Sequence, residues 1–454
     1  MSPKQVDGPR PPSVDTVLRR LRPSVDGAAP AALTDVVRGV VADERTRLRG
    51  GGTPRDAGLL ADVARQRLGG FEDPAIPAVI NATGVIVHTN LGRAPWPADV
   101  ARAMAEAATS YVLLEMDRGT GRRGARARAA EDHLVALTGA DDALVTNNNA
   151  AALALAVGLV GRGGIVVSRG ELVEIGGGVR IPEIIRRAGA RLIEVGTTNR
   201  TRSGDFEAAL ADGRARAVLR VHPSNFAMAG FTESPDPTAV ADIAHRYDAI
   251  VIDDLGSGAL LDTATYGLAH EPMPSERLAA GSDVVTFSGD KLVGGPQSGL
   301  IVGRADLIAK MRRDPLARAM RPDKATMAGV ARTLGLYRAG RAEAEIPVWR
   351  MIATPVAALR ARASEMADAL GPRAEVVDLR STVGGGSLPG ETLPSIGVAL
   401  SGPAATKLVD VLRNGEPPVV ARIEGRRVFL DLRTVDPASD AALIRAVGVA
   451  LGAR

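Results

Sequence analysis

Hydrophobic and polar residues follow one dominant pattern through the middle of this chain. Between about residues 80 and 325, short apolar runs alternate with stretches of helical periodicity. Continuous apolar runs are typical of strands covered on both faces, as in a mostly parallel sheet between two helical layers. The pattern therefore predicts a three-layer α/β domain with strands at Ala143–Thr146, Ile165–Ser168, Arg191–Val195, Ala217–Val221, Ala249–Asp253, Val284–Ser288 and Gly299–Val302.

The two flanking regions have different patterns. Before the α/β region, amphipathic helices are expected at Val14–Leu21, Ala31–Arg49 and Ala57–Leu68, which predicts a small helical domain. After Pro322, helical stretches lead into a smaller α+β region. Its helices are expected at Lys324–Arg341 and Pro355–Leu370, and its strands at Ala374–Asp378, Ser395–Leu400, Val419–Ile423 and Arg427–Leu432. We therefore expect three domains, at residues 1–70, 71–325 and 326–454.

Composition excludes several classes of protein. The chain has 454 residues, enough to bury a sizeable core, and it contains no Cys. The absence of Cys excludes disulfides, thiolate metal sites and cysteine nucleophiles, and no metal site is expected. The N-terminal residues lack an apolar signal sequence, and no stretch approaches 18 uninterrupted apolar residues. A cytoplasmic protein with no membrane partner is expected.

The net charge of +4 is concentrated at one end of the chain. Residues 1–70 hold 12 Lys and Arg against 8 Asp and Glu, and the remaining 384 residues hold 44 of each. A basic module on a neutral body indicates an anionic partner such as RNA or DNA, although an ordinary solvated surface explains so small an excess equally well. Aromatic residues make up only 3% of the chain, so a nucleic acid would be held mainly by phosphate contacts and shape.

One lysine is unusual, because Arg outnumbers Lys by 51 to 5. Lys291 follows the predicted strand Val284–Ser288 and precedes a glycine-rich turn at residues 294–299. An amine with an accessible neutral form can make a Schiff base, and a guanidinium group cannot. Lys291 is therefore a candidate to hold an aldehyde cofactor as an imine at the mouth of an α/β sheet.

Two further strand ends carry residues that suit such a cofactor. Asp253 and Asp254 end a strand before a glycine-rich segment, and one of the two can pair with a protonated pyridine nitrogen. Asn148 and Asn149 open an Ala-rich helix, whose N-terminus can receive a phosphate. These elements occur in the same order in pyridoxal-phosphate enzymes with an aspartate-aminotransferase-like fold, which this part of the chain resembles.

Other motifs leave alternatives open. Residues 119–124 match G-x-G-x-x-G, but the segment before them ends in charged residues, so a dinucleotide site is not favoured. His222 ends a predicted strand close to the expected cofactor ring, where it can be functional. His88 lies in a polar run at residues 81–93, which is either a site segment or a structural entry loop.

Longer segments of the chain resemble bacterial selenocysteine synthases, the L-seryl-tRNA(Sec) selenium transferases. Residues 13–68 resemble the N-terminal helical domain of that family only loosely. The segments that carry the resemblance cover the α/β region densely: NATGVIVHTNLGRAP (81–95), LEMDRGTGRRGAR (114–126), TNNNAAALAL (146–155), RGELVEIGGGVRIPEI (169–184), VHPSNFAMAGFTE (221–233), DDLGSG (253–258), FSGDKLVGGPQSGLIVG (287–303) and PLARAMRPDK (315–324).

This resemblance implies the type I fold of pyridoxal-phosphate-dependent transferases and a set of site residues. Pyridoxal 5'-phosphate is expected on Lys291, beside Asp290, with Asp254 at the pyridine nitrogen. The residues expected near the rest of the cofactor are Ser288, Asn148, Asn149, His222 and Asn225. The residues expected to bind the selenium donor, selenophosphate, are Arg93, Arg318 and Arg321.

The resemblance also implies a reaction, partners and an assembly. Seryl-tRNA(Sec) is expected to lose water by β-elimination through an aminoacrylate, and selenium is then added to give selenocysteinyl-tRNA(Sec). A homo-oligomer is expected, as a ring of dimers (a decamer). Two alternatives remain: a pyridoxal-phosphate lyase of the same superfamily that acts on a small phosphorylated amino-sugar acid, and a non-catalytic RNA-binding protein. The basic N-terminal extension favours the tRNA enzyme over the lyase.

Overall fold

The protein is described by a computed structural model that covers residues 10–25, 29–69, 76–123, 126, 128–226, 228, 230–402 and 404–452. The chain divides into two compact units, Met1–Ala78 and Val79–Arg454. The three-domain division expected from the sequence stays a prediction. No helix in the described ranges is long and apolar enough to cross a membrane.

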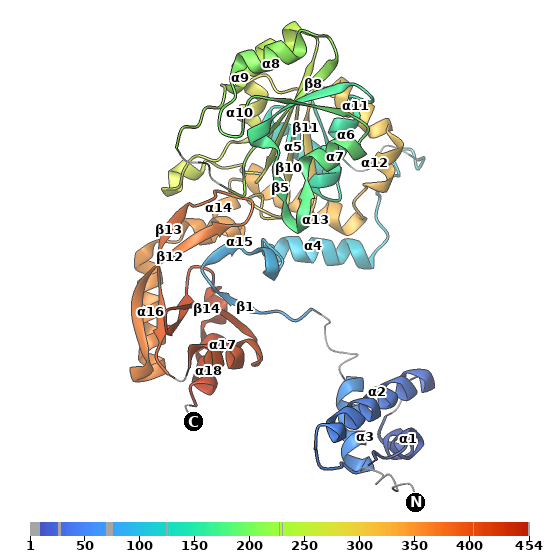
Figure 1. Cartoon of the computed structure of the whole chain (residues 1–454), viewed down its shortest axis with the longest axis vertical. Coiled ribbons are helices and arrows are strands. Elements are labelled where there is room, and N and C mark those ends of the chain that lie inside the picture. Colours follow the sequence, from blue (N-terminus) through green and yellow to red (C-terminus); the bar gives the residue numbers. More distant parts are fainter. Residues whose placement is uncertain are drawn as a thin grey trace, which may run out of the picture. The chain divides into compact units, whose positions relative to one another are not determined.

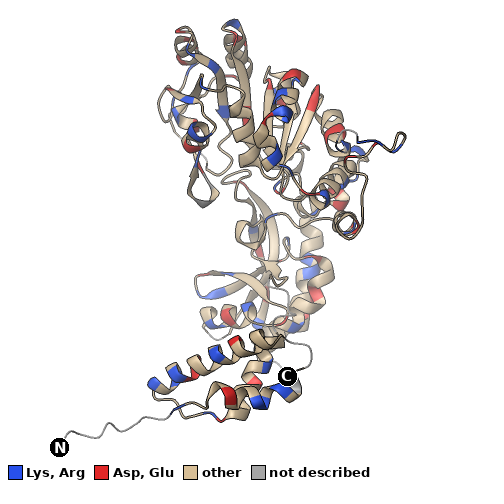
Figure 2. Cartoon of the chain, turned by 90° about the vertical axis from the view of Figure 1, so that its right-hand side faces the viewer, with Lys and Arg blue, Asp and Glu red and all other residues tan. Residues whose placement is uncertain are grey.

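Three helices build the N-terminal unit, and their bounds agree with the sequence prediction to within one residue: α1 (Val14–Leu21), α2 (Pro30–Arg49) and α3 (Ala57–Gly69). The side chain of Ser13 begins α1 by accepting a hydrogen bond from the Thr16 backbone N–H. The apolar stripes of the helices meet in a core that includes Val17, Leu21, Val37, Leu60 and Ala64. Lys and Arg are interleaved with Asp and Glu on the outer faces (Figure 2).

A seven-stranded sheet forms the centre of one part of the second unit (Figure 1). All its strands are parallel except β11, which pairs antiparallel with β10 and with β3. The seven predicted strands are all present, and their ends agree within three residues. In spatial order they are β3 (Asp142–Thr146), β11 (Gly299–Gly303), β10 (Val284–Ser288), β9 (Ile250–Gly256), β8 (Ala215–Val221), β4 (Gly164–Ser168) and β7 (Arg191–Val195).

Neighbouring residues of these strands enter two different hydrophobic cores. Val284 packs with residues of α6 and α7, whereas Val285 packs with residues of α5 and α13. Helices therefore cover both faces of the sheet, which confirms the predicted three-layer α/β fold. The helices of this part are α4 (Ala98–Thr109), α5 (Ala129–Thr138), α6 (Asn149–Gly158), α7 (Ile181–Arg187), α8 (Ser203–Leu210), α9 (Pro237–Arg246), α10 (Pro274–Ala279), α11 (Ala305–Arg313), α12 (Pro315–Ala319) and α13 (Lys324–Arg338).

A six-stranded sheet forms the C-terminal part of the same unit. In spatial order its strands are β1 (Ile80–Ala82), β14 (Val419–Glu424), β15 (Arg427–Asp431), β13 (Thr392–Leu400), β12 (Ala374–Gly384) and β2 (Val85–Val87). Its helices are α14 (Ala342–Glu345), α15 (Pro347–Ala353), α16 (Val356–Leu370), α17 (Ala405–Arg413) and α18 (Asp440–Ala450). A turn at Glu424-Gly425 joins β14 to β15 as an antiparallel hairpin.

Long-range contacts explain where the local predictions were wrong. Residues 80–87, which the sequence places with the α/β region, pair instead with β14 and β12 of the C-terminal sheet. Helix α5 begins at Ala129, after the G-x-G-x-x-G match at residues 119–124. Arg126 donates to Glu115 and to the carbonyl oxygen of Pro322, so its side chain holds this segment in tertiary contacts.

Candidate active site

Lys291 lies at the carboxyl end of β10, in the turn that connects this strand to β11. The Gly289 N–H donates to the Ser298 carbonyl oxygen (2.9 Å), and the Leu292 N–H donates to the Ser257 carbonyl oxygen (3.0 Å). A Cβ at residue 289 would meet the Pro296 carbonyl oxygen at 2.8 Å, so only glycine fits there. These contacts fix the backbone on both sides of Lys291 and direct its side chain into a cavity.

That cavity has a volume of about 320 Å³, within the usual range for small-molecule sites. It brings together eight of the eleven predicted site residues: Arg93, Asn148, Asn149, His222, Asp254, Ser288, Asp290 and Lys291. They come from segments far apart in the sequence and meet at the carboxyl ends of the parallel strands, where such sheets bind ligands. Among the described residues, no Phe, Tyr or Trp side chain lines the cavity, and His222 supplies the one ring there.

The cavity environment lowers the pKa of Lys291. Burial of the amine is the main cause, since removing water disfavours the ammonium form, and the positive charge of Arg93 adds to the effect. The carboxylates of Asp254, Asp290 and Glu271 act in the opposite direction. Lys291 therefore loses its proton at a lower pH than an exposed lysine, as a nucleophilic amine requires.

Asp254 is the strand-end carboxylate that faces the cavity. Its Oδ1 accepts hydrogen bonds from Asn149 Nδ2 (2.8 Å) and Thr286 Oγ1 (2.9 Å), and burial raises its pKa. A cationic ring nitrogen beside this carboxylate would offset the cost of its burial. Asp253 does not line the cavity, because successive strand residues point to opposite faces, and it accepts instead from Ser282 Oγ (3.0 Å).

The N-terminus of α6 lines the same cavity. Asn148 caps the helix by accepting a hydrogen bond from the Ala151 backbone N–H (2.9 Å). Asn149 is the first residue of the helix, and its buried Oδ1 has no hydrogen-bond partner among the described residues. Exposed backbone N–H groups and the helix dipole both favour an anion here. Ser288 is buried close by, at the end of β10.

Arg93 reaches the cavity through an unusual backbone turn. The segment after β2 folds back on itself, with the Arg93 N–H donating to the His88 carbonyl oxygen (2.9 Å). Arg93 has a φ of 66°, in the left-handed region that residues other than glycine rarely adopt. Its guanidinium group donates to Asp290 Oδ2 at 2.6 Å. His88 thus belongs to the structural loop that positions Arg93.

His222 lies close to a buried carboxylate that the sequence did not reveal. Its Nε2 lies 3.3 Å from Oε1 of Glu271, a carboxylate that is only 2% exposed. Glu271 follows no strand and belongs to no recognisable motif, so no sequence signal could have found it. Asn225, in contrast, lies outside the cavity lining, and its Nδ2 donates to the Glu174 carbonyl oxygen (2.8 Å).

Arg318 and Arg321 do not reach the Lys291 cavity of their own chain. α12 ends at Ala319, so Arg318 lies in this helix and Arg321 lies after it. Arg321 lies 3.5 Å from Glu115 and lines a different cavity, whereas Arg318 is exposed. Glu115 also pairs with Arg123 (2.9 Å) of the G-x-G-x-x-G motif, and the described residues 119–120 of this motif lie in a turn that no strand precedes.

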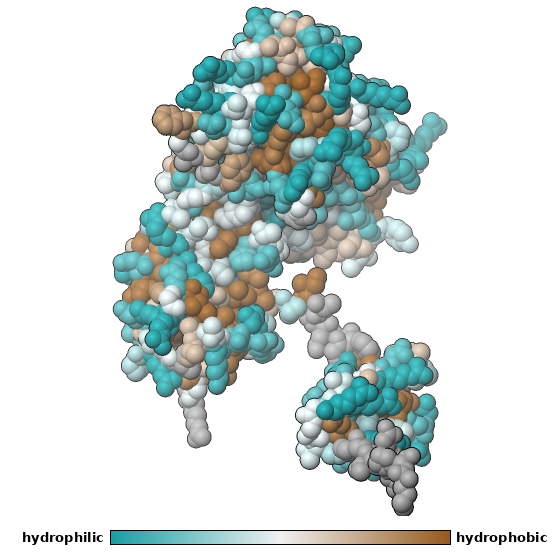
Figure 3. All heavy atoms as spheres, viewed as in Figure 1, coloured by the Kyte–Doolittle hydropathy of each residue, from teal (hydrophilic) through white to brown (hydrophobic). Residues whose placement is uncertain are grey.

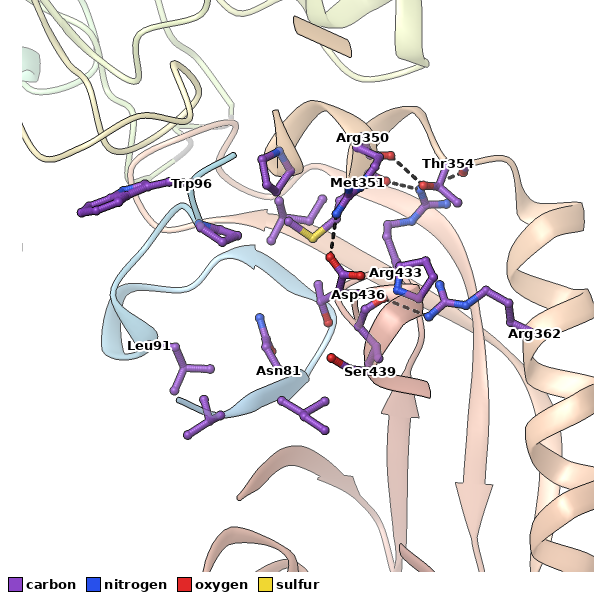
Figure 4. A pocket seen from close by; sticks show the side chains of 18 of the residues that line it. Asn81, Leu91, Trp96, Arg350, Met351, Thr354, Arg362, Arg433, Asp436 and Ser439 are labelled. Carbon is purple, nitrogen blue, oxygen red and sulfur yellow. Dashed lines mark hydrogen bonds and ion pairs between the residues drawn. The ribbon is translucent and has the colours of Figure 1, made fainter. Parts of the chain in front are cut away.

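A second cavity, of about 410 Å³, is drawn in Figure 4. Arg93 lines both this cavity and the Lys291 cavity. Arg350 donates to Asp436 there (2.7 Å), and Arg433 donates to the carbonyl oxygens of Met351 (2.7 Å) and Thr354 (3.0 Å). These guanidinium groups hold the wall of the cavity together.

Comparison with known proteins decides between the possible families. A family model described as "SelA: L-seryl-tRNA selenium transferase" matches residues 79–436. The chain belongs to this family. Two relatives named L-seryl-tRNA(Sec) selenium transferase agree with the assignment. The protein of Alkaliphilus metalliredigens is 44% identical over 389 residues, covering 84% of this chain and 83% of its own length. That of Rhizobium meliloti is 41% identical over 437 residues, covering 93% of both.

The fold comparison extends this result. A solved structure of D-glucosaminate-6-phosphate ammonia-lyase has a TM-score of 0.59 and 23% identity, covering 85% of this chain and 97% of the other. At this identity the likeness shows the fold alone. The cofactor of this selenium transferase family is pyridoxal 5'-phosphate, as the sequence predicted. The cavity fits it, because it combines a buried amine, a buried carboxylate and an unpartnered Asn149 oxygen at a helix N-terminus.

Proposed function

We propose that this chain converts L-seryl-tRNA(Sec) into L-selenocysteinyl-tRNA(Sec), with selenophosphate as the selenium donor. The supporting observation is the half-buried Lys291, which shares one cavity with Asp254 and the N-terminus of α6 in a member of the selenium transferase family. A cytoplasmic location stays a prediction from the sequence.

Different residues of the cavity would bind different parts of the cofactor. Lys291 would bind its aldehyde carbon covalently, Asp254 would pair with its ring nitrogen, and Asn148, Asn149 and Ser288 would surround its phosphate. When bound, pyridoxal phosphate supplies an electron-accepting ring that allows a proton to leave Cα and a hydroxyl group to leave Cβ of the seryl group.

The other residues act on protons and charge. The amine of Lys291 can accept the Cα proton, since its lowered pKa keeps a neutral form accessible. Asp290 holds the Arg93 guanidinium group through a 2.6 Å hydrogen bond at the edge of the cavity. Arg93 can thereby offer two parallel N–H donors to a phosphate oxygen pair of the selenium donor.

We further propose that the N-terminal unit binds the tRNA. Arg10, Arg45 and Arg49 line one groove of this unit, together with Pro11, Pro12 and Ser13. Arg45 and Arg49 are exposed and make no ion pair with an acidic residue among the described residues. Two cations that protein carboxylates do not neutralise are available to phosphates.

The double variant Arg45→Ala, Arg49→Ala is expected to weaken tRNA binding and to reduce the slope of log affinity against log salt by about 2, one for each lost phosphate contact. Filter binding at several salt concentrations measures both quantities. The control is Arg38→Ala, Arg65→Ala, which removes the same charge from residues that pair with Asp35 and Asp62. Equal salt slopes for the two double variants would contradict the proposal that this groove binds tRNA phosphates.

The site is also proposed to be completed by assembly. Arg318 and Arg321 lie away from the Lys291 cavity of their own chain, so a donor pocket that contains all three arginines needs a second copy. On the unit Val79–Arg454, hydrophobic side chains are exposed among hydrophilic ones (Figure 3). Tyr111, Leu113 and Met116 are exposed in one short segment. Burial of this segment between copies would stabilise an oligomer, proposed as a ring of dimers.

The function itself is tested by supplying the purified holoenzyme with seryl-tRNA(Sec) and selenophosphate. We expect selenocysteinyl-tRNA, identified by mass spectrometry of the released amino acid. Unacylated tRNA should give no product, and glucosamine-type acid phosphates should release no ammonia. Ammonia release with no selenium incorporation would instead identify the chain as a lyase.

A further inference from the structure

A segment from the other sheet of the unit lies directly beside the Lys291 side chain. Residues 385–391 join β12 to β13, and we call them the hairpin tip. A Cβ built on Gly386 would lie 2.5 Å from Lys291 Nζ, 2.8 Å from its Cε and 3.2 Å from its Cδ. The lysine side chain therefore runs directly along the Gly386 backbone, in space that any other residue would fill.

The amine is confined from two sides. A Cβ on Gly256, at the end of β9, would lie 3.8 Å from Lys291 Nζ. The strand end thus limits the amine on one side, and the hairpin tip limits it on the other. Gly386 has a φ of 82°, which favours glycine for a second, independent reason.

The hairpin tip is anchored at three points. Before it, Gly384 pairs with Val87 of β2. Within it, Leu388 is only 4% exposed and packs in the same core as Leu292 and Val293, the residues after Lys291. At its end, the Glu391 carboxylate accepts a hydrogen bond from the Ala269 backbone N–H (3.1 Å). A segment held this way can act as a rigid wall.

We infer that the hairpin tip is a positioning element for the cofactor lysine: it holds Lys291 Nζ in the orientation from which the amine attacks the aldehyde, and Gly386 provides the necessary space. This inference rests on the proposed function and deepens it. It also connects the C-terminal sheet to the chemistry, because any displacement of β12 and β13 would move the wall beside the amine.

The test is Gly386→Ala, compared with Gly390→Ala in the same hairpin tip. Gly390 has the same φ of 82°, but a Cβ there meets no described atom within 4 Å, so the pair separates backbone strain from contact with Lys291. Apoprotein is mixed with pyridoxal phosphate, and covalent capture is followed by visible absorbance and by borohydride labelling. Binding of pyridoxamine phosphate, which has no aldehyde, is measured in parallel.

We expect Gly386→Ala to slow covalent capture at least tenfold relative to Gly390→Ala and to alter the absorption band, with pyridoxamine phosphate binding unchanged. Equal capture rates and spectra in the two variants would overturn the inference. If Gly386→Ala fails to fold, Leu388→Ala provides the test, because it loosens the packing of the hairpin tip without adding atoms beside Lys291. Slower covalent capture of pyridoxal phosphate by Leu388→Ala would support the inference, and an unchanged rate would refute it. The capture assay contains neither tRNA nor a selenium donor. Its result therefore does not depend on whether the protein transfers selenium, which is measured in the separate assay of the proposed function.

Discussion

Replacing Lys291 with alanine is expected to abolish covalent capture of pyridoxal phosphate and to lower selenium transfer by at least about 10²–10⁴-fold, the usual contribution of a general acid–base group alone. The residue that would both hold the cofactor and accept the Cα proton is lost in this variant. Borohydride reduction of the wild-type holoenzyme followed by peptide mapping should place the label on residue 291.

Two other lysines provide matched controls for this experiment. Lys310 Nζ donates to the Leu159 carbonyl oxygen and Lys324 Nζ to the Ser110 carbonyl oxygen, both at exposed positions. Lys310→Ala and Lys324→Ala should keep full capture and full activity. Labelling of either residue in the wild-type protein would contradict the assignment of Lys291.

The pH dependence of capture follows from the lowered pKa of Lys291. Because the neutral amine is the nucleophile, the rate should rise with pH and level off below the ordinary lysine value of about 10.4. Arg93 contributes to the lowering, so Arg93→Ala should raise the pKa and move the midpoint of the profile to higher pH. A midpoint that stays in place would show that burial alone sets the pKa.

The central fold was predictable because its signals are local. Each strand of the seven-stranded sheet is a continuous apolar run, since both faces are buried, and such runs are visible in any short window of sequence. β1 and β2 were missed because each has three residues and is defined by partners more than 290 residues away. β12 extends to Gly384 through Arg380 and Ser381, which are polar residues that mask a strand.

The site was predictable to the same extent and for the same reason. Lys291, Asp254 and Asn149 lie at or just after the carboxyl ends of strands, so parallel topology brings them to one edge of the sheet. Glu271 and Gly386 come from irregular segments, and their distances to His222 and Lys291 depend on tertiary packing alone. The sequence could not show which of Asp253 and Asp254 faces the cavity. Side chains alternate between the two faces of a strand, so a shift of one residue in the register would exchange the two carboxylates.

Loss of both Arg318 and Arg321 is expected to reduce the use of selenophosphate by about 10²–10⁴-fold. Each charged hydrogen bond contributes about 1.5–3 kcal/mol, so two arginines together correspond to about 3–6 kcal/mol. The Arg318→Ala, Arg321→Ala variant should retain covalent cofactor capture and tRNA binding, because Arg318 and Arg321 lie apart from the Lys291 cavity of their own chain and outside the N-terminal unit. If this variant bound selenophosphate and transferred selenium as well as the wild-type protein does, the two arginines would be only surface charges.

Mixed oligomers reveal from which copy the two arginines act. Chains with Lys291→Ala and chains with Arg318→Ala, Arg321→Ala are each expected to be inactive alone. When the two are coexpressed, a site with intact Lys291 can receive intact arginines from a neighbouring copy, and selenium transfer should return in part. If the arginines instead served the cavity of their own chain, no mixed site would contain all three residues and activity would stay absent. Recovery of activity would therefore support both the donor pocket and its formation between subunits.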